Sequence, residues 1–154
     1  MRRLAVLGSL LALGYLSLTP PPTAEAPPTD WPEYNGGADR NHFSPLAQLT
    51  PANVSRLKVA WSYASGGADT VKNNTQIQCN PLVVNGVLYG VSAGSQAFAV
   101  DAATGKELWK TAFTDDTFAM NSRGVTYWSD GKQARIFFAY GSFLYALDAR
   151  TGKP

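Results

Sequence analysis

Short apolar runs separated by Gly, Asn and Asp follow one another along most of the chain. The runs are rich in β-branched and aromatic residues and lack the 3.6-residue period of an amphipathic helix, so they predict strands. One predicted hairpin joins 81–84 to 87–91 through Asn85-Gly86, a pair that suits the positive φ angles of a type I′ turn. A second predicted hairpin joins 135–140 to 143–147. The pattern therefore predicts a mostly β protein.

The chain also repeats itself. Residues 94–106 align with residues 141–153, and the two stretches lie 47 residues apart. Trp61 and Trp109, each in a short apolar run, are separated by 48 residues. A unit of about 47 residues that holds several short strands has the size of one four-stranded blade of a β-propeller. The predicted fold class is all-β, built from propeller blades.

The repeated stretch contains residues that suit a tight turn followed by a packing tryptophan. A strand ends at Asp101, whose side chain can accept hydrogen bonds from the turn with Thr104, and Gly105 suits the left-handed position that closes it. The next strand carries Trp109, a flat indole that can cover the flank of a neighbouring blade while its N–H donates to a carbonyl. This motif is expected to be structural rather than catalytic.

The first residues predict the cellular destination of the chain. Arg2 and Arg3 precede an uncharged apolar run over 4–18, which is followed by Pro20-Pro21-Pro22 and the small-x-small sequence 24–26. This order is typical of a secretory signal peptide at 1–26. The run is shorter than the roughly 20 residues of a spanning helix, although a retained anchor in the inner membrane is the alternative. In a Gram-negative bacterium the destination is the periplasm.

Composition narrows the class of partner. Thirteen Lys and Arg against eleven Asp and Glu leave a formal charge of +2, spread too evenly to indicate a nucleic-acid partner. Cys79 is the only cysteine, so an intrachain disulfide and a multi-cysteine metal site are both excluded. We expect Cys79 to be a small buried residue in a strand, and His42 to have a structural role.

The complete motif A-x-D-x-x-T-G-K-x-x-W at Ala99–Trp109 resembles the tryptophan-docking motif of the quinoprotein dehydrogenases, the pyrroloquinoline quinone (PQQ) enzymes. Other segments agree with that family in the same order, and the start is most similar to its glucose dehydrogenase branch. These segments are 31–34, 41–46, 53–61, 75–89 and 121–128. The resemblance covers 31–154 and implies the N-terminal portion of an eight-bladed propeller, of which this chain holds about two to three blades.

The resemblance also implies two cofactor-binding residues. Arg123 stands where the family places an arginine against PQQ, and a guanidinium can hold a carboxylate or quinone oxygen by two hydrogen bonds. Gln78 stands where alcohol-oxidising members carry a glutamate, and an amide can contact the quinone but cannot act as a base. Those members also place two adjacent cysteines before the arginine, whereas this chain has none there. The absence of this cysteine pair favours glucose or a related sugar or polyol as substrate over methanol or ethanol.

Other functional parts are expected outside these residues. In the family, calcium ligands and a catalytic aspartate come from later blades, so we expect no catalytic or metal-binding residue in this chain, which alone would be inactive. We expect a signal peptide at 1–26, a leader with the first propeller strands at 27–60, a blade with its docking motif at 61–110, and an incomplete blade at 111–154. Electrons would pass to a membrane quinone or a cytochrome.

Two other functions remain open at this point. One is a non-catalytic propeller scaffold similar to outer-membrane assembly proteins, which share the docking motif but not the element at 123–128. The other is a PQQ-binding fragment or pseudoenzyme that works without calcium. Calcium ligands in the downstream coding sequence would favour the dehydrogenase.

Overall fold

The computed structural model describes residues 30–72, 75–111 and 122–154. The predicted signal peptide therefore lies outside the described residues, as do residues 118–121, part of the stretch before Arg123 in which the sequence has no adjacent cysteines. Within the described ranges, no helix is both long enough and apolar enough to span a membrane.

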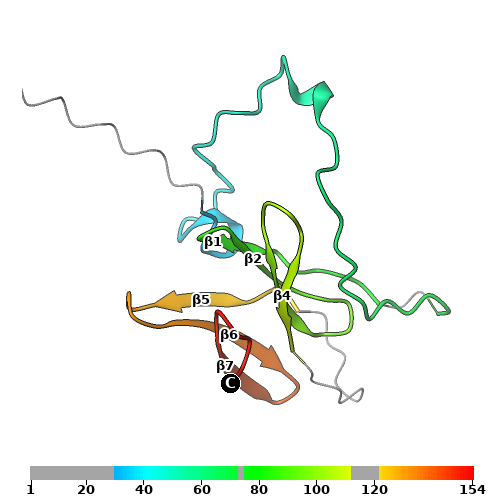
Figure 1. Cartoon of the computed structure of the whole chain (residues 1–154), viewed down its shortest axis with the longest axis vertical. Coiled ribbons are helices and arrows are strands. Elements are labelled where there is room, and N and C mark those ends of the chain that lie inside the picture. Colours follow the sequence, from blue (N-terminus) through cyan, green and yellow to red (C-terminus); the bar gives the residue numbers. More distant parts are fainter. Residues whose placement is uncertain (1–29, 73–74, 112–121) are drawn as a thin grey trace, which may run out of the picture.

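Four antiparallel strands form the first sheet, in the order β1-β2-β3-β4 (Figure 1). Their bounds are β1 Leu82–Val84, β2 Val87–Val91, β3 Ala97–Asp101 and β4 Glu107–Lys110. The turn between β1 and β2 has φ 50° at Asn85 and 75° at Gly86, which confirms the predicted hairpin. The sequential order and four strands are those of a single propeller blade.

The second sheet has three described strands in the order β5-β6-β7. They are β5 Thr126–Ser129, β6 Ala134–Tyr140 and β7 Phe143–Asp148. β5 and β6 are joined by a turn in which the Asp130 carboxylate accepts hydrogen bonds from the backbone N–H groups of Lys132 and Gln133. The β6–β7 hairpin closes with Tyr140 opposite Phe143, and this confirms the second predicted hairpin.

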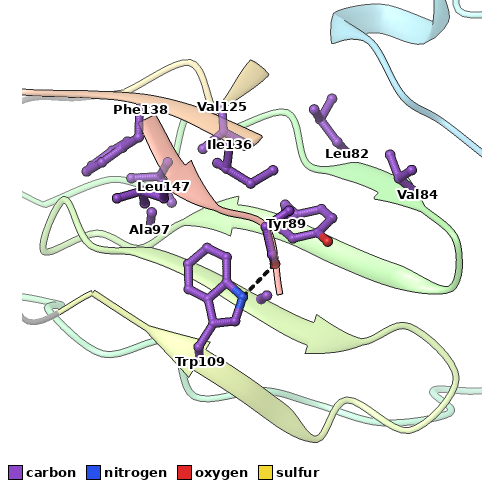
Figure 2. Packing of buried hydrophobic residues seen from close by; sticks show 12 residues of the cluster. Leu82, Val84, Tyr89, Ala97, Trp109, Val125, Ile136, Phe138 and Leu147 are labelled. Atoms are coloured by element: carbon purple, nitrogen blue, oxygen red, sulfur yellow. Dashed lines mark hydrogen bonds between the residues drawn. The ribbon is translucent and has the colours of Figure 1, made fainter. Parts of the chain in front are cut away.

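The core lies between the two sheets (Figure 2). Alternate residues of the first sheet face it, and the same alternation on β6 and β7 buries Ile136, Phe138 and Leu147 of the second sheet. The main contributors are Leu82, Tyr89, Ala97, Ala99 and Trp109 from the first sheet, with Ile136, Phe138 and Leu147 from the second. Two sheets packed face to face through one apolar layer are neighbouring blades.

The residues before the first sheet differ from the expectation. We expected the first propeller strands within 27–60 and a blade over 61–110, whereas residues 30–81 contain only two short 3-10 turns and one isolated bridge among the described positions, and the sheet spans 82–110. The turns are η1 Tyr34–Gly36 and η2 Val54–Arg56. Backbone groups form a strand only beside a hydrogen-bonding neighbour, and the extended stretch near Trp61 has none among the described residues.

Trp31 forms the bridge. Its backbone N–H and C=O both bond to Val83, at 2.6 and 3.0 Å, and so cover the outer edge of β1.

Cys79 is half-buried and precedes β1, so the prediction of a strand residue was wrong. Its sulfur accepts the Val91 N–H at 3.3 Å, and burial raises the pKa of the thiol, which therefore stays protonated at neutral pH.

Candidate functional site before the first strand of each sheet

The two docking tryptophans make equivalent contacts. Trp61 Nε1 donates to the carbonyl of Ala102 at 3.1 Å, and Trp109 Nε1 donates to that of Ala149 at 2.9 Å (Figure 2). Each indole covers the glycine of the same turn, Gly105 or Gly152, where an added Cβ would lie 2.5 Å from the ring. The sequence prediction of a tryptophan that covers a neighbouring blade while bonding a carbonyl is confirmed.

The turns on which the indoles rest are held by carboxylates. Asp101 Oδ1 accepts hydrogen bonds from the Thr104 N–H and hydroxyl at 2.8 and 2.7 Å. Asp148 does the same with Thr151, with both bonds at 2.9 Å. The threonine hydroxyls are the first cause that lowers the pKa of both carboxyls, with the backbone N–H groups adding to it. Both carboxylates therefore accept hydrogen bonds within their own turns, and they are poor candidates for a catalytic base.

The predicted cofactor residues lie at corresponding places in the two sheets. Gln78 precedes β1 by four residues, Arg123 precedes β5 by three, and each of these strands is the first of its sheet. The two segments are in contact, because the backbone N–H of Asn80 donates to the carbonyl of Arg123 at 2.9 Å. The fold thus brings together two segments that are far apart in the sequence, at the point where the chain enters both sheets.

The two side chains differ in exposure. Arg123 is exposed, whereas Gln78 is partly buried and its Nε2 donates to Gln76 Oε1 at 3.1 Å. The guanidinium offers parallel N–H donors to a planar anion, and the amides of Gln76 and Gln78 offer neutral donors and acceptors. This set of groups fits an acidic, planar ligand better than a bare cation.

Sequence reasoning missed the residues that hold this site together. Gly124 has φ 134°, and a Cβ there would lie 2.9 Å from the Asn80 carbonyl oxygen, so only glycine allows the two segments to approach so closely. The sequence does contain a signal for this contact between the two segments, because both stand just before the first strand of a repeated unit. A repeat places such positions at one end of adjacent blades.

Two hollows lie elsewhere on the described surface. The larger, about 250 Å³, is apolar and lies on the flank of the first sheet that faces away from the second. The smaller, about 210 Å³, lies between the N-terminal segment and β5 and is lined by Glu33, Tyr34, Arg40, Thr126 and Tyr127, among others. Neither is lined by Gln78 or Arg123. Among the described residues no group of three or more His, Cys, Asp or Glu could hold a metal ion.

Docked tryptophans, sequential four-stranded topology and face-to-face sheets define a β-propeller built from docking-motif blades. The family model for the β-propeller domain of PQQ-type glucose/ethanol/alcohol dehydrogenases matches residues 31–154. The chain belongs to this family of PQQ-dependent dehydrogenases, and both the fold class and the family resemblance are confirmed.

Named relatives agree with that assignment. The chain is 37% identical to the dehydrogenase subunit of a quinone alcohol dehydrogenase of Gluconobacter oxydans (strain 621H), over 82% of this chain and 16% of that protein. It is 34% identical to quinoprotein glucose dehydrogenase A of Acinetobacter calcoaceticus, over 75% of this chain and 16% of that protein. The chain thus spans about a sixth of the length of these relatives.

Solved structures show the same fold. The quinohemoprotein alcohol dehydrogenase of Comamonas testosteroni superposes with a TM-score of 0.69 at 29% identity, over 80% of this chain and 18% of that one. A europium-containing methanol dehydrogenase superposes with a TM-score of 0.64 at 25% identity, over 80% and 22%.

Proposed function

We propose that this chain forms N-terminal propeller blades of a periplasmic PQQ-dependent dehydrogenase that oxidises a hydroxyl group of glucose or a related sugar or alcohol. The observation that carries the proposal is the Asn80–Arg123 backbone contact, which sets Gln78 and Arg123 at one end of adjacent blades. Two blades that each contribute a polar side chain at the same end can line one ligand.

The chemistry of these residues suits the cofactor. PQQ, when bound, accepts the two electrons that leave the substrate as its hydroxyl becomes a carbonyl. Arg123 would hold a carboxylate or quinone oxygen, and its positive charge favours the electron-rich reduced form. Gln78 would orient the quinone by hydrogen bonds, but its amide cannot remove a proton. The proton acceptor is therefore assigned to another part of the dehydrogenase.

The substrate is proposed from two kinds of support. The sequence before Arg123 lacks adjacent cysteines, and by the family resemblance this absence favours a sugar or polyol. The relatives include alcohol, glucose and glycerol dehydrogenases by name, at 37%, 34% and 29% identity. The proposal therefore keeps glucose first and includes related alcohols.

The metal and the electron acceptor belong to the same proposal. We assign calcium as the metal beside PQQ, with ligands supplied by other blades, although one of the similar solved structures is a europium-containing enzyme. A membrane quinone or a cytochrome is assigned as acceptor, in keeping with the quinone and quinohemoprotein names of relatives.

The test uses the complete protein encoded by the reading frame that contains this chain. The protein is freed of PQQ, reconstituted with PQQ plus Ca²⁺ or a lanthanide, and assayed for dye reduction with glucose, ethanol and glycerol. The proposal predicts PQQ-dependent activity that is highest with glucose and is supported by Ca²⁺. Activity only with ethanol would overturn glucose as the preferred substrate, and activity only with a lanthanide would overturn calcium as the metal. No PQQ-dependent activity with any substrate would favour the scaffold alternative, because docking motifs alone suit either function.

A further inference from the structure

The backbone, rather than packing, sets the direction of the Arg123 side chain. This side chain is exposed, so packing restrains it little. The Arg123 carbonyl accepts the Asn80 N–H at 2.9 Å, and this bond ties the peptide group that follows Arg123 to the segment before β1. The place where the guanidinium can meet a ligand therefore depends on how firmly residues 122–124 are held.

Gly124 is both required in this segment and a source of freedom. A Cβ at Gly124 would lie 2.9 Å from the Asn80 carbonyl oxygen, so the close approach of the two segments needs glycine. Glycine also adopts backbone conformations that other residues avoid, so the chain beside it rotates more freely. A segment that must contain glycine and must also direct an exposed side chain needs a further restraint.

The side chain of Ser122 supplies that restraint. Its Oγ accepts the Gly124 N–H at 3.2 Å and donates to the Gly124 carbonyl at 3.1 Å. Together with the Asn80 bond, this one hydroxyl holds the two peptide groups that follow Arg123. Ser122 is partly buried, where hydrogen bonds are stronger than in water.

We propose that Ser122 is a positioning residue of the cofactor site and acts on the ligand only through Arg123. The inference rests on the proposed function and adds a residue to that site. The single hydroxyl proton of Ser122 is donated to Gly124, so it is not free to bond an anionic ligand. The guanidinium of Arg123 makes the contact, and Ser122 limits the directions in which it can point.

This arrangement affects affinity through preorganisation. An arginine that already points to its ligand loses less conformational freedom on binding than a mobile one. Removal of the Ser122 hydroxyl leaves the guanidinium chemically unchanged but lets the backbone beside it move. The affinity for an anionic quinone should then fall about 3- to 10-fold, in keeping with the size of single local hydrogen bonds.

The experiment measures the dissociation constant for PQQ by reconstitution titration of the complete protein encoded by the reading frame. Ser122→Ala should raise this constant about 3- to 10-fold, whereas Ser122→Thr keeps a hydroxyl and should bind like the wild type. The matched control is Ser129→Ala. Ser129 Oγ accepts the Gly131 N–H at 3.1 Å in the same Ser-x-Gly arrangement, at the other end of β5, so its removal should leave PQQ binding unchanged.

A double-mutant cycle tests whether Ser122 acts through Arg123. In the Arg123→Ala background, Ser122→Ala should cause no further loss of PQQ affinity, because no guanidinium remains to be positioned. Equal losses in the two backgrounds would overturn the inference, since Ser122 would then act independently of Arg123.

Hydrogen exchange in the PQQ-free protein separates this inference from the proposed function. Ser122→Ala should speed exchange in the segment 122–125 and leave the strands of both sheets unchanged. Faster exchange throughout both sheets would make Ser122 a general structural residue and overturn the inference. Wild-type PQQ affinity in Ser122→Ala, with weakened binding in Arg123→Ala, would overturn the inference alone. Wild-type affinity in both variants would overturn the proposed cofactor site as well.

Discussion

At the scale of single residues, the docking motif stands out because the same hydrogen bonds occur twice. Asp101 with Thr104 and Asp148 with Thr151 form the same pair of hydrogen bonds, 47 residues apart, and each turn carries the indole of a tryptophan from an earlier segment of the chain. An aspartate that accepts several local donors holds its turn without any help from burial. The carboxylate thus links the end of one strand to the contact between blades.

This coupling predicts a pH dependence of stability. The pKa of Asp148 is lowered first by the Thr151 hydroxyl, so its contribution is present above the ordinary carboxyl pKa near 4 and is lost as the pH falls through the lower folded value. Thr151→Val should therefore lower the urea midpoint of unfolding more at about pH 7 than at about pH 2.5. The exposed Thr70→Val is the control. An equal loss at both pH values would show that the hydroxyl does not act through the ionised carboxylate.

At the scale of elements, the blades are joined by a close approach between an indole and a glycine turn. Gly152 has φ 69° and lies under Trp109, which is only 8% exposed. A side chain at this position would be strained in its backbone and would also displace the ring that bonds Ala149. The contact therefore depends on two independent properties of glycine.

A matched pair of substitutions separates those properties. Gly131→Ala, at φ 83° with no atom near the added methyl, should cost only the left-handed backbone strain of about 1–2 kcal/mol. Gly152→Ala should cost about 1–3 kcal/mol more, because the indole must shift. Urea unfolding followed by tryptophan fluorescence gives both values. Equal losses in the two variants would contradict the docking account.

Most elements of the sheets could be predicted because they depend on local signals. Asn85-Gly86 determines one hairpin, and the repeated Asp-Thr-Gly turns reveal the blade period. The unpaired state of residues 57–63 within the described chain could not be predicted, because an apolar run forms a strand only where a neighbour is present. The Trp31–Val83 bridge could not be predicted either, since it joins residues 52 positions apart that are not linked by a hairpin turn.

At the scale of the whole molecule, the candidate site is shared between blades. The family resemblance predicts Gln78 and Arg123 as cofactor residues, and the fold shows that their segments touch, through Asn80 and the side-chain-free Gly124. A site divided in this way requires the blades to be packed correctly before the ligand can bind. The docking turns are therefore structural parts on which the proposed cofactor site depends.

The most direct test of this account is the affinity of the complete protein for PQQ when Arg123 is changed. Arg123→Ala removes charge-assisted hydrogen bonds of about 1.5–3 kcal/mol, so the dissociation constant from a reconstitution titration should rise about 10- to 150-fold. Arg56→Ala, which removes an exposed arginine far from the site in sequence, should leave it unchanged. Wild-type affinity in Arg123→Ala would contradict the placement of the cofactor beside the segments that precede β1 and β5.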